Sequence, residues 1–177
     1  MATLPIRAVC GWLAALSLLM SPAQAEVSAD RLKITYIQNF LSLVRWGDIG
    51  MPGELHLCTF PDSRLGSQIL ETLHHKTVAG QLVIGQSIAT NNLQLTGCHV
   101  MFIPESMAPY APGLLARAST YPLLTISDMP SFVDQGGMIG FVIDQDKLRF
   151  EINQQAAARH NLRISAKLLE LARRVIQ

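Results

Sequence analysis

Side chains that could do chemistry are spread along this chain and form no known pattern. His74 and His75 are adjacent, so on a helix their side chains would diverge by about 100 degrees, which is poor geometry for holding one metal ion. His99 follows a cysteine, but no further ligand lies at zinc-site spacing. Asp144 and Asp146 could chelate a cation, although a solvated turn is the commoner role for such a pair. The sequence therefore predicts no metal site.

A catalytic nucleophile is equally hard to place. The chain contains no Gly-x-Ser-x-Gly elbow, and it keeps no free thiol beyond the N-terminal segment if Cys58 and Cys98 pair. Its glycine-rich element, at residues 135–138, precedes a predicted strand, which is the wrong context for binding phosphate. Gly136 and Gly137 are therefore interpreted as turn residues that allow positive φ. We predict no catalytic residue and no cofactor, and hence a protein that is not an enzyme.

Charged residues gather in the last third of the chain. Arg149 and Glu151 alternate with apolar residues, so both are expected on the solvent side of an outer strand. Arg159 and Arg163 follow within a dozen residues. This group could be a solvated surface, or a recognition patch in which guanidinium groups bind carboxylates of a partner. If these residues form a recognition patch, reversing the charge at Glu151 or Arg163 should weaken partner binding and leave the melting temperature nearly unchanged.

The elements expected to position these residues alternate between helices and strands. Residues 28–46 are predicted to form a helix with Ser28 as its N-cap, because Leu32, Tyr36 and Phe40 recur at helical spacing. The next elements are a loop at 47–53, strands at 55–60, 82–84, 100–103 and 123–126, and helices at 65–73, capped by Asp62 or Ser63, and at 107–119. Strands that alternate with helices favour parallel pairing through crossover connections.

The last third changes character. Residues 138–143 and 148–152 are apolar runs joined by a short polar segment, which predicts an antiparallel hairpin. A short helix at 156–159 and a final helix at 164–175 are expected to follow. We find no internal repeat and no interior linker. The predicted fold is a single α/β domain with a mixed central sheet, of parallel strands and a C-terminal antiparallel hairpin, flanked by helices.

The N-terminus has the layout of a secretory signal peptide. Arg7 precedes an apolar run at residues 11–20, and Ala23 and Ala25 place small residues at the cleavage-determining positions. The run is about half of the roughly 20 residues that a membrane-spanning helix needs. We therefore expect cleavage after Ala25, export to the periplasm, and one mature domain at residues 26–177.

Cysteine content and charge agree with export. Cys58 and Cys98 remain after cleavage, and in an oxidising compartment they are expected to form a disulfide. This bond would close a loop of about 40 residues and contribute roughly 4 kcal/mol. Two buried thiols are the alternative. The formal net charge is +1, with no basic patch, so nucleic acid is not an expected partner.

Several motifs in the chain resemble those of a known family. They are Ile-Gln-Asn-Phe at 37–40, Val-Arg-Trp at 44–46, Cys-His-Val-Met-Phe-Ile at 98–103, Leu-Leu-Thr-Ile-Ser-Asp at 123–128, Gly-Gly-Met-Ile at 136–139, Arg-Phe-Glu-Ile-Asn at 149–153, and the run from 162 to 172. Together, and in this order, they resemble the YfiR family. Gly136, Gly137, Phe150 and Asn153 belong to the family motif.

The resemblance implies a periplasmic α/β domain that acts by binding. Family members repress an inner-membrane diguanylate cyclase through its periplasmic sensor region, which lowers cyclic-di-GMP and biofilm formation. An outer-membrane lipoprotein of the peptidoglycan-binding type can sequester the repressor. A homodimer is a further option for a small regulator. A small-molecule sensing or solute-binding module is the alternative function, although its aromatic candidates, Tyr36, Phe40 and Trp46, fit core packing better.

The resemblance also bears on particular residues. Cys58 and Cys98 match a disulfide pair of the family, whereas Val133 and Gly140 stand where a second pair is found, so the second bridge is absent here. Glu151, Arg159 and Arg163 fall at positions that the family uses to contact partners or small ligands. The resemblance thus favours the recognition patch over the solvated surface.

Overall fold

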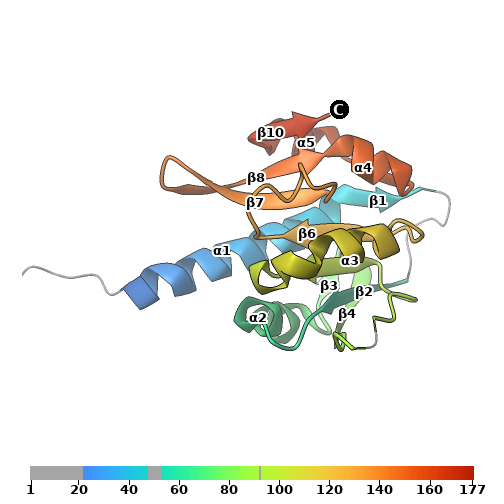
Figure 1. The fold of residues 1–177 in the computed structure, drawn as a ribbon, viewed down its shortest axis with the longest axis horizontal. Helices are drawn as coiled ribbons and strands as arrows, with labels where there is room; N and C mark the ends of the chain where they lie inside the picture. Colours follow the sequence, from blue (N-terminus) through green and yellow to red (C-terminus); the bar gives the residue numbers. More distant parts are fainter. Residues whose placement is uncertain (1–21, 48–52, 92) are drawn as a thin grey trace, which may run out of the picture.

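A computed structural model describes residues 22–47, 53–91 and 93–177 of the 177-residue chain, with side chains from residue 29 onward. Most of the predicted signal peptide and of the predicted loop at 47–53 lies outside these residues. The central element is an eight-stranded sheet (Figure 1). Its strands, in spatial order, are β10 (Arg174–Ile176), β8 (Lys147–Asn153), β7 (Ile139–Asp144), β6 (Leu124–Ser127), β5 (Val100–Ile103), β2 (Glu54–Thr59), β4 (Gln81–Ser87) and β3 (Thr77–Val78).

The sheet is mixed, as predicted. Five adjacent strands are parallel to one another: β4, β2, β5, β6 and β7. Strands β7 and β8 form the predicted antiparallel hairpin. The hairpin turns at Gln145 and Asp146, both of which have positive φ, the backbone that a two-residue turn between twisted strands requires. The single α/β domain with a mixed sheet between helices is therefore confirmed.

Helices cover the two faces of the sheet (Figure 1). Helix α1 (Pro22–Leu43) and α2 (Arg64–Leu73) pack on one face, and α3 (Ala111–Ala118) packs on the other. The alternation of side chains along each strand supplies both cores. In β2, for example, Leu57 belongs to the core under α1 and α2, whereas Cys58 belongs to the core under α3.

The first predicted helix has different ends in the structure. It begins at Pro22, before Ser28, so the prediction of Ser28 as N-cap is wrong; proline is favoured in the first helical turn, where its missing N–H costs nothing. The helix ends at Leu43, and Val44–Trp46 forms strand β1, which pairs antiparallel with β9 (Leu162–Ile164). A β-branched and an aromatic residue favour a strand once a partner strand is available.

The predicted final helix at 164–175 is also wrong. The structure divides it into the end of β9, helix α5 (Ala166–Leu171) and strand β10. Ser165 caps α5, because its hydroxyl accepts a hydrogen bond from the Leu168 N–H. Beyond α5, pairing of β10 with β8 overrides the helical spacing of the apolar residues.

Smaller differences concern the middle of the chain. The predicted helix at 107–119 is a 3₁₀ turn, η1 (Glu105–Tyr110), followed by α3, because Pro109 and Pro112 delay the α-helix. Strand β3 was not predicted, and β4 is longer than the predicted 82–84. Of the two predicted caps of α2, Ser63 is used, since its Oγ accepts from the Gly66 N–H at 2.9 Å. The short helix near 156–159 is α4 (Gln154–Arg159).

The predicted disulfide between Cys58 and Cys98 is confirmed. Cys58 lies in β2, and Cys98 lies two residues before β5, which pairs with β2. Both residues are buried in the core under α3. The bond therefore links two neighbouring strands at the centre of the sheet.

Candidate functional site

Glu151 lies in a different environment from the one predicted. It is 4% exposed, so the prediction that it faces solvent is wrong. Its carboxylate accepts hydrogen bonds from the guanidinium groups of Arg173, at 2.7 Å, and Arg174, at 2.6 Å. The reason is β10, which lies beside β8 and brings Arg174 into register with Glu151. Alternation along β8 predicts the correct face, but that face is covered by the C-terminal segment.

Two aspartates complete this group, which we call the C-terminal clamp (Asp134, Asp144, Glu151, Arg173 and Arg174). Arg174 makes a bidentate contact with Asp134 at 2.7 and 2.8 Å, and Arg173 lies 3.3 Å from Asp144. The hydrogen bond from Arg174, supported by Arg173, lowers the pKa of Glu151 against the opposing effect of burial. The clamp therefore keeps Glu151 ionised and fixes the C-terminal strand to the hairpin.

The family-motif residues have structural roles around the clamp. Gly136 has the predicted positive φ, +96°, and a side chain at Gly137 would collide with the ring of Phe132. Asn153 accepts from the Ala156 N–H at 2.8 Å, which caps α4, and donates to the Val133 carbonyl oxygen.

Phe150 lies on the other face of β8, in an aromatic cluster. Its ring centroid is 5.0 Å from that of Phe40 and 5.5 Å from that of Tyr36. Trp46 is also buried, and its indole N–H donates to the Pro122 carbonyl oxygen. The interpretation of Tyr36, Phe40 and Trp46 as core residues is therefore confirmed.

Arg163 lies in β9, directly opposite Arg45 of β1. Both side chains are exposed, and within the described parts of the chain neither forms an ion pair. Like charges at directly opposed positions of a ladder destabilise it. The two arginines thus place two positive charges at opposed positions, and Arg45 Nη1 donates to the Ser42 carbonyl oxygen at 3.0 Å. Sequence reasoning missed Arg45 because the residue was assigned to a helix, where it would not face Arg163.

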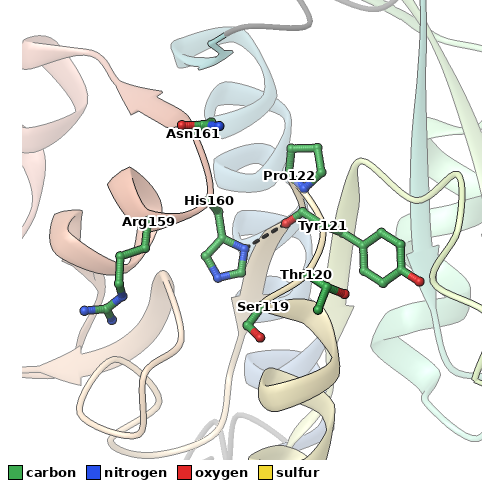
Figure 2. A pocket seen from close by; sticks show the side chains of 7 residues that line it. All are labelled: Ser119, Thr120, Tyr121, Pro122, Arg159, His160 and Asn161. Carbon is green, nitrogen blue, oxygen red and sulfur yellow. Dashed lines mark hydrogen bonds between the residues drawn. The ribbon is translucent and has the colours of Figure 1, made fainter.

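Arg159 ends α4 and lines a cavity of about 340 Å³, shown in Figure 2. The cavity is formed by residues 119–122 and 159–161. His160 Nδ1 lies 2.8 Å from the Tyr121 carbonyl oxygen, so this bond holds the imidazole against the opposite wall. The Arg159 guanidinium forms no ion pair with any acidic residue in the described structure; its Nη1 donates to Gln155 Oε1. A guanidinium, an imidazole and hydroxyl groups suit a polar ligand that carries negative charge.

The three predicted site residues thus do not form one patch. Arg159 and Arg163 lie close in sequence, at the end of α4 and in β9, whereas Glu151 belongs to the clamp. Arg173 and Arg174 were missed because their apolar neighbours suggested a helix. Across residues 22–47, 53–91 and 93–177, no group of three metal-ligating side chains occurs, and no helix could cross a membrane.

The fold defines a single-domain, mixed α/β protein. Residues 30–173 match the YfiR/HmsC-like family model, which covers most of the domain, so the chain belongs to the YfiR/HmsC-like family. This family is regulatory and not catalytic. Membership suggests that the chain is a periplasmic regulator of a diguanylate cyclase. Among curated proteins, none matches the chain.

Two solved structures share the fold. A conserved domain protein from Vibrio cholerae O1 biovar El Tor matches with a TM-score of 0.53 and 12% identity, over 82% of this chain and 60% of that one. The ABC domain from Streptococcus pneumonia, solved in complex with L-Trp, matches with a TM-score of 0.57 and 16% identity, over 78% and 60%. The chain spans about 60% of the length of each. At these identities the likeness shows the fold alone.

Proposed function

We propose that this protein is exported to the periplasm and represses an inner-membrane diguanylate cyclase by binding its periplasmic sensor region. Repression lowers cyclic-di-GMP and biofilm formation. The observation that carries the proposal is the family match over residues 30–173. Export is supported by the signal-peptide pattern that ends at Ala25, and by the disulfide between Cys58 and Cys98, a bond that persists in oxidising compartments.

The surface proposed for this contact comprises Arg45, Arg159 and Arg163, which we call the basic surface. All three side chains are exposed. Arg45 and Arg163 oppose each other, and neither forms an ion pair within the described residues, at some cost to folding. Carboxylates of a partner would compensate this charge through bidentate hydrogen bonds. The basic surface therefore fits an acidic segment of the cyclase.

Complementation of a gene deletion tests the contact. Arg45→Glu and Arg163→Glu should each fail to lower cyclic-di-GMP, although both variants fold. Arg31→Glu is the matched control, because Arg31 is an exposed arginine on α1, away from β1 and β9. Cyclic-di-GMP that falls equally with Arg163→Glu and with wild type would show that the basic surface does not contact the cyclase.

Two further partners belong to this proposal. An outer-membrane, peptidoglycan-binding lipoprotein would sequester the repressor and release the cyclase, and a second copy of the chain would form a homodimer. Co-purification after crosslinking in cells tests the lipoprotein, and sedimentation of the purified protein tests the dimer. A monomer at all concentrations, or no lipoprotein among the crosslinked proteins, would remove the corresponding partner.

A small-molecule sensing function is the second candidate. It is favoured by the cavity beside Arg159 and His160, and by the structural neighbour that was solved in complex with L-Trp. Isothermal titration of L-Trp into the purified protein tests it, with Arg159→Gln as the variant expected to weaken binding. Heat of binding that is unchanged in Arg159→Gln would remove this cavity as the site.

A further inference from the structure

Three loops meet at the carboxyl ends of three neighbouring strands of the sheet, β2, β4 and β5. Strand β2 has β4 on one side and β5 on the other, and all three strands are parallel (Figure 1). After β2 the chain forms β4 on one side of β2, and it then crosses back to form β5 on the other side. In open α/β sheets, ligands bind outside the carboxyl ends of the strands at such a reversal of direction, because the two outgoing loops diverge and leave a crevice.

A cavity of about 430 Å³ occupies this place. Its walls come from the segments that follow the three strands: Asp62 after β2; Thr90, Asn91 and Leu93 after β4; Ser106, Met107 and Tyr110 after β5. It is separate from the cavity of Figure 2, with which it shares no lining residue.

Asp62 is the one charged side chain among the described residues that line this cavity. It was an alternative cap for α2, but Ser63 fills that role, so the carboxylate of Asp62 is not used by the helix. Within the described structure it makes no hydrogen bond or ion pair. The nearest cation in sequence, Arg64, is bound to Asp30 at 2.8 Å. A negative charge therefore stands at the cavity without a protein partner.

The remaining walls are mixed. The side-chain hydroxyl of Ser106 and the side chains of Thr90 and Asn91 make no hydrogen bond to any part of the chain that the structure describes, so they are available to a ligand. Met107 supplies an apolar wall, and the ring of Tyr110 is 65% exposed beside it. The Asp62 carboxylate attracts a cation, and Met107 and Tyr110 offer apolar surface to the rest of such a ligand.

We propose that this cavity binds a small organic cation, an amine attached to an apolar or aromatic group. The ammonium would pair with the Asp62 carboxylate, and the apolar part would contact Met107 and Tyr110. A ligand anion is disfavoured, because no described lining residue carries positive charge. The inference does not depend on the proposed function, since the site lies on other elements than the basic surface.

Calorimetry with three probes of similar shape tests the proposal: 2-phenylethylamine, 2-phenylethanol and 3-phenylpropionate, each titrated into the purified protein. The amine should bind at least tenfold more tightly than the alcohol and the carboxylate. Asp62→Asn should abolish this preference without lowering the melting temperature, and Tyr110→Ala should weaken the amine and the alcohol alike. Asp146→Asn, which removes another exposed turn carboxylate, is the control and should retain the preference.

Two results would overturn the proposal. One is equal binding, or no binding, of the three probes to the wild-type protein. The other is a preference for the amine that survives in Asp62→Asn, which would place the cation elsewhere. Because these measurements use the purified protein alone, they fail or succeed independently of any effect on cyclic-di-GMP.

Discussion

The C-terminal clamp makes the stability of the domain sensitive to one carboxylate. Glu151→Gln keeps the size of the side chain but leaves one acceptor oxygen where the carboxylate has two. Of the hydrogen bonds from Arg173 and Arg174, one is therefore lost and the other goes to a neutral acceptor. A charge-assisted bond contributes about 1.5–3 kcal/mol and a neutral one about 0.5–1.5. The lost bond and the weakened one together amount to about 2 kcal/mol, after a reduction for arginines that are 44% and 39% exposed.

Thermal unfolding of the wild type and the variant measures this loss. In a domain of this size, about 2 kcal/mol corresponds to a melting temperature lower by roughly 4–8 °C. Glu170→Gln is the matched control, since Glu170 is an exposed glutamate on α5. A double-mutant cycle with Arg174→Gln should give a coupling of about 1 kcal/mol. A Glu151→Gln variant with the same melting temperature as Glu170→Gln would refute the reasoning and restore the interpretation of Glu151 as a surface residue.

The clamp also predicts a pH dependence. The hydrogen bond from Arg174 and the support of Arg173 lower the pKa of Glu151 in the folded state below its ordinary value. The contribution of Glu151 is therefore complete above the unfolded pKa and disappears as pH falls through the folded pKa. The free energy of unfolding should fall between about pH 5 and pH 3, and less steeply in Glu151→Gln. Parallel curves for the two proteins would contradict this assignment.

Three further variants test the packing of the domain. Cys58→Ser should lower the free energy of unfolding by roughly 4 kcal/mol, because it opens the loop that the disulfide closes; two reactive thiols in the unfolded, unreduced wild type would contradict the bond. Gly137→Ala should lower the melting temperature, since its Cβ would collide with Phe132, and an unchanged temperature would show that the ring can move. Val133→Cys combined with Gly140→Cys should form a second disulfide, because a Cβ at Gly140 would lie 3.5 Å from Val133 Cγ1; free thiols after oxidation would argue against this adjacency.

Elements with strong local signals could be predicted from the sequence. The apolar runs of β2, β5, β6, β7 and β8 follow directly from their composition, and the alternation of helices and strands predicts the parallel sheet. The disulfide follows from two cysteines beyond an N-terminus that predicts export. These features depend on residues that are close in sequence, or on the compartment.

Features set by distant partners could not be predicted. Residues 44–46 continue the helical spacing of α1, and only pairing with β9 makes them a strand. Residues 174–176 continue the helical spacing of α5, and only pairing with β8 makes them a strand. The environment of Glu151 depends on the second of these pairings, because β10 brings the two arginines to it. The wrong prediction that Glu151 faces solvent is therefore a consequence of the error in the predicted final helix.

The measurement that tests the central claim most directly is cellular cyclic-di-GMP after deletion of this gene, with complementation by forms that carry or lack the N-terminal 25 residues. Periplasmic repression predicts that cyclic-di-GMP rises on deletion, and that only the form with the signal peptide lowers it again. Cyclic-di-GMP that does not change on deletion, or that the form without the signal peptide restores equally well, would contradict the account.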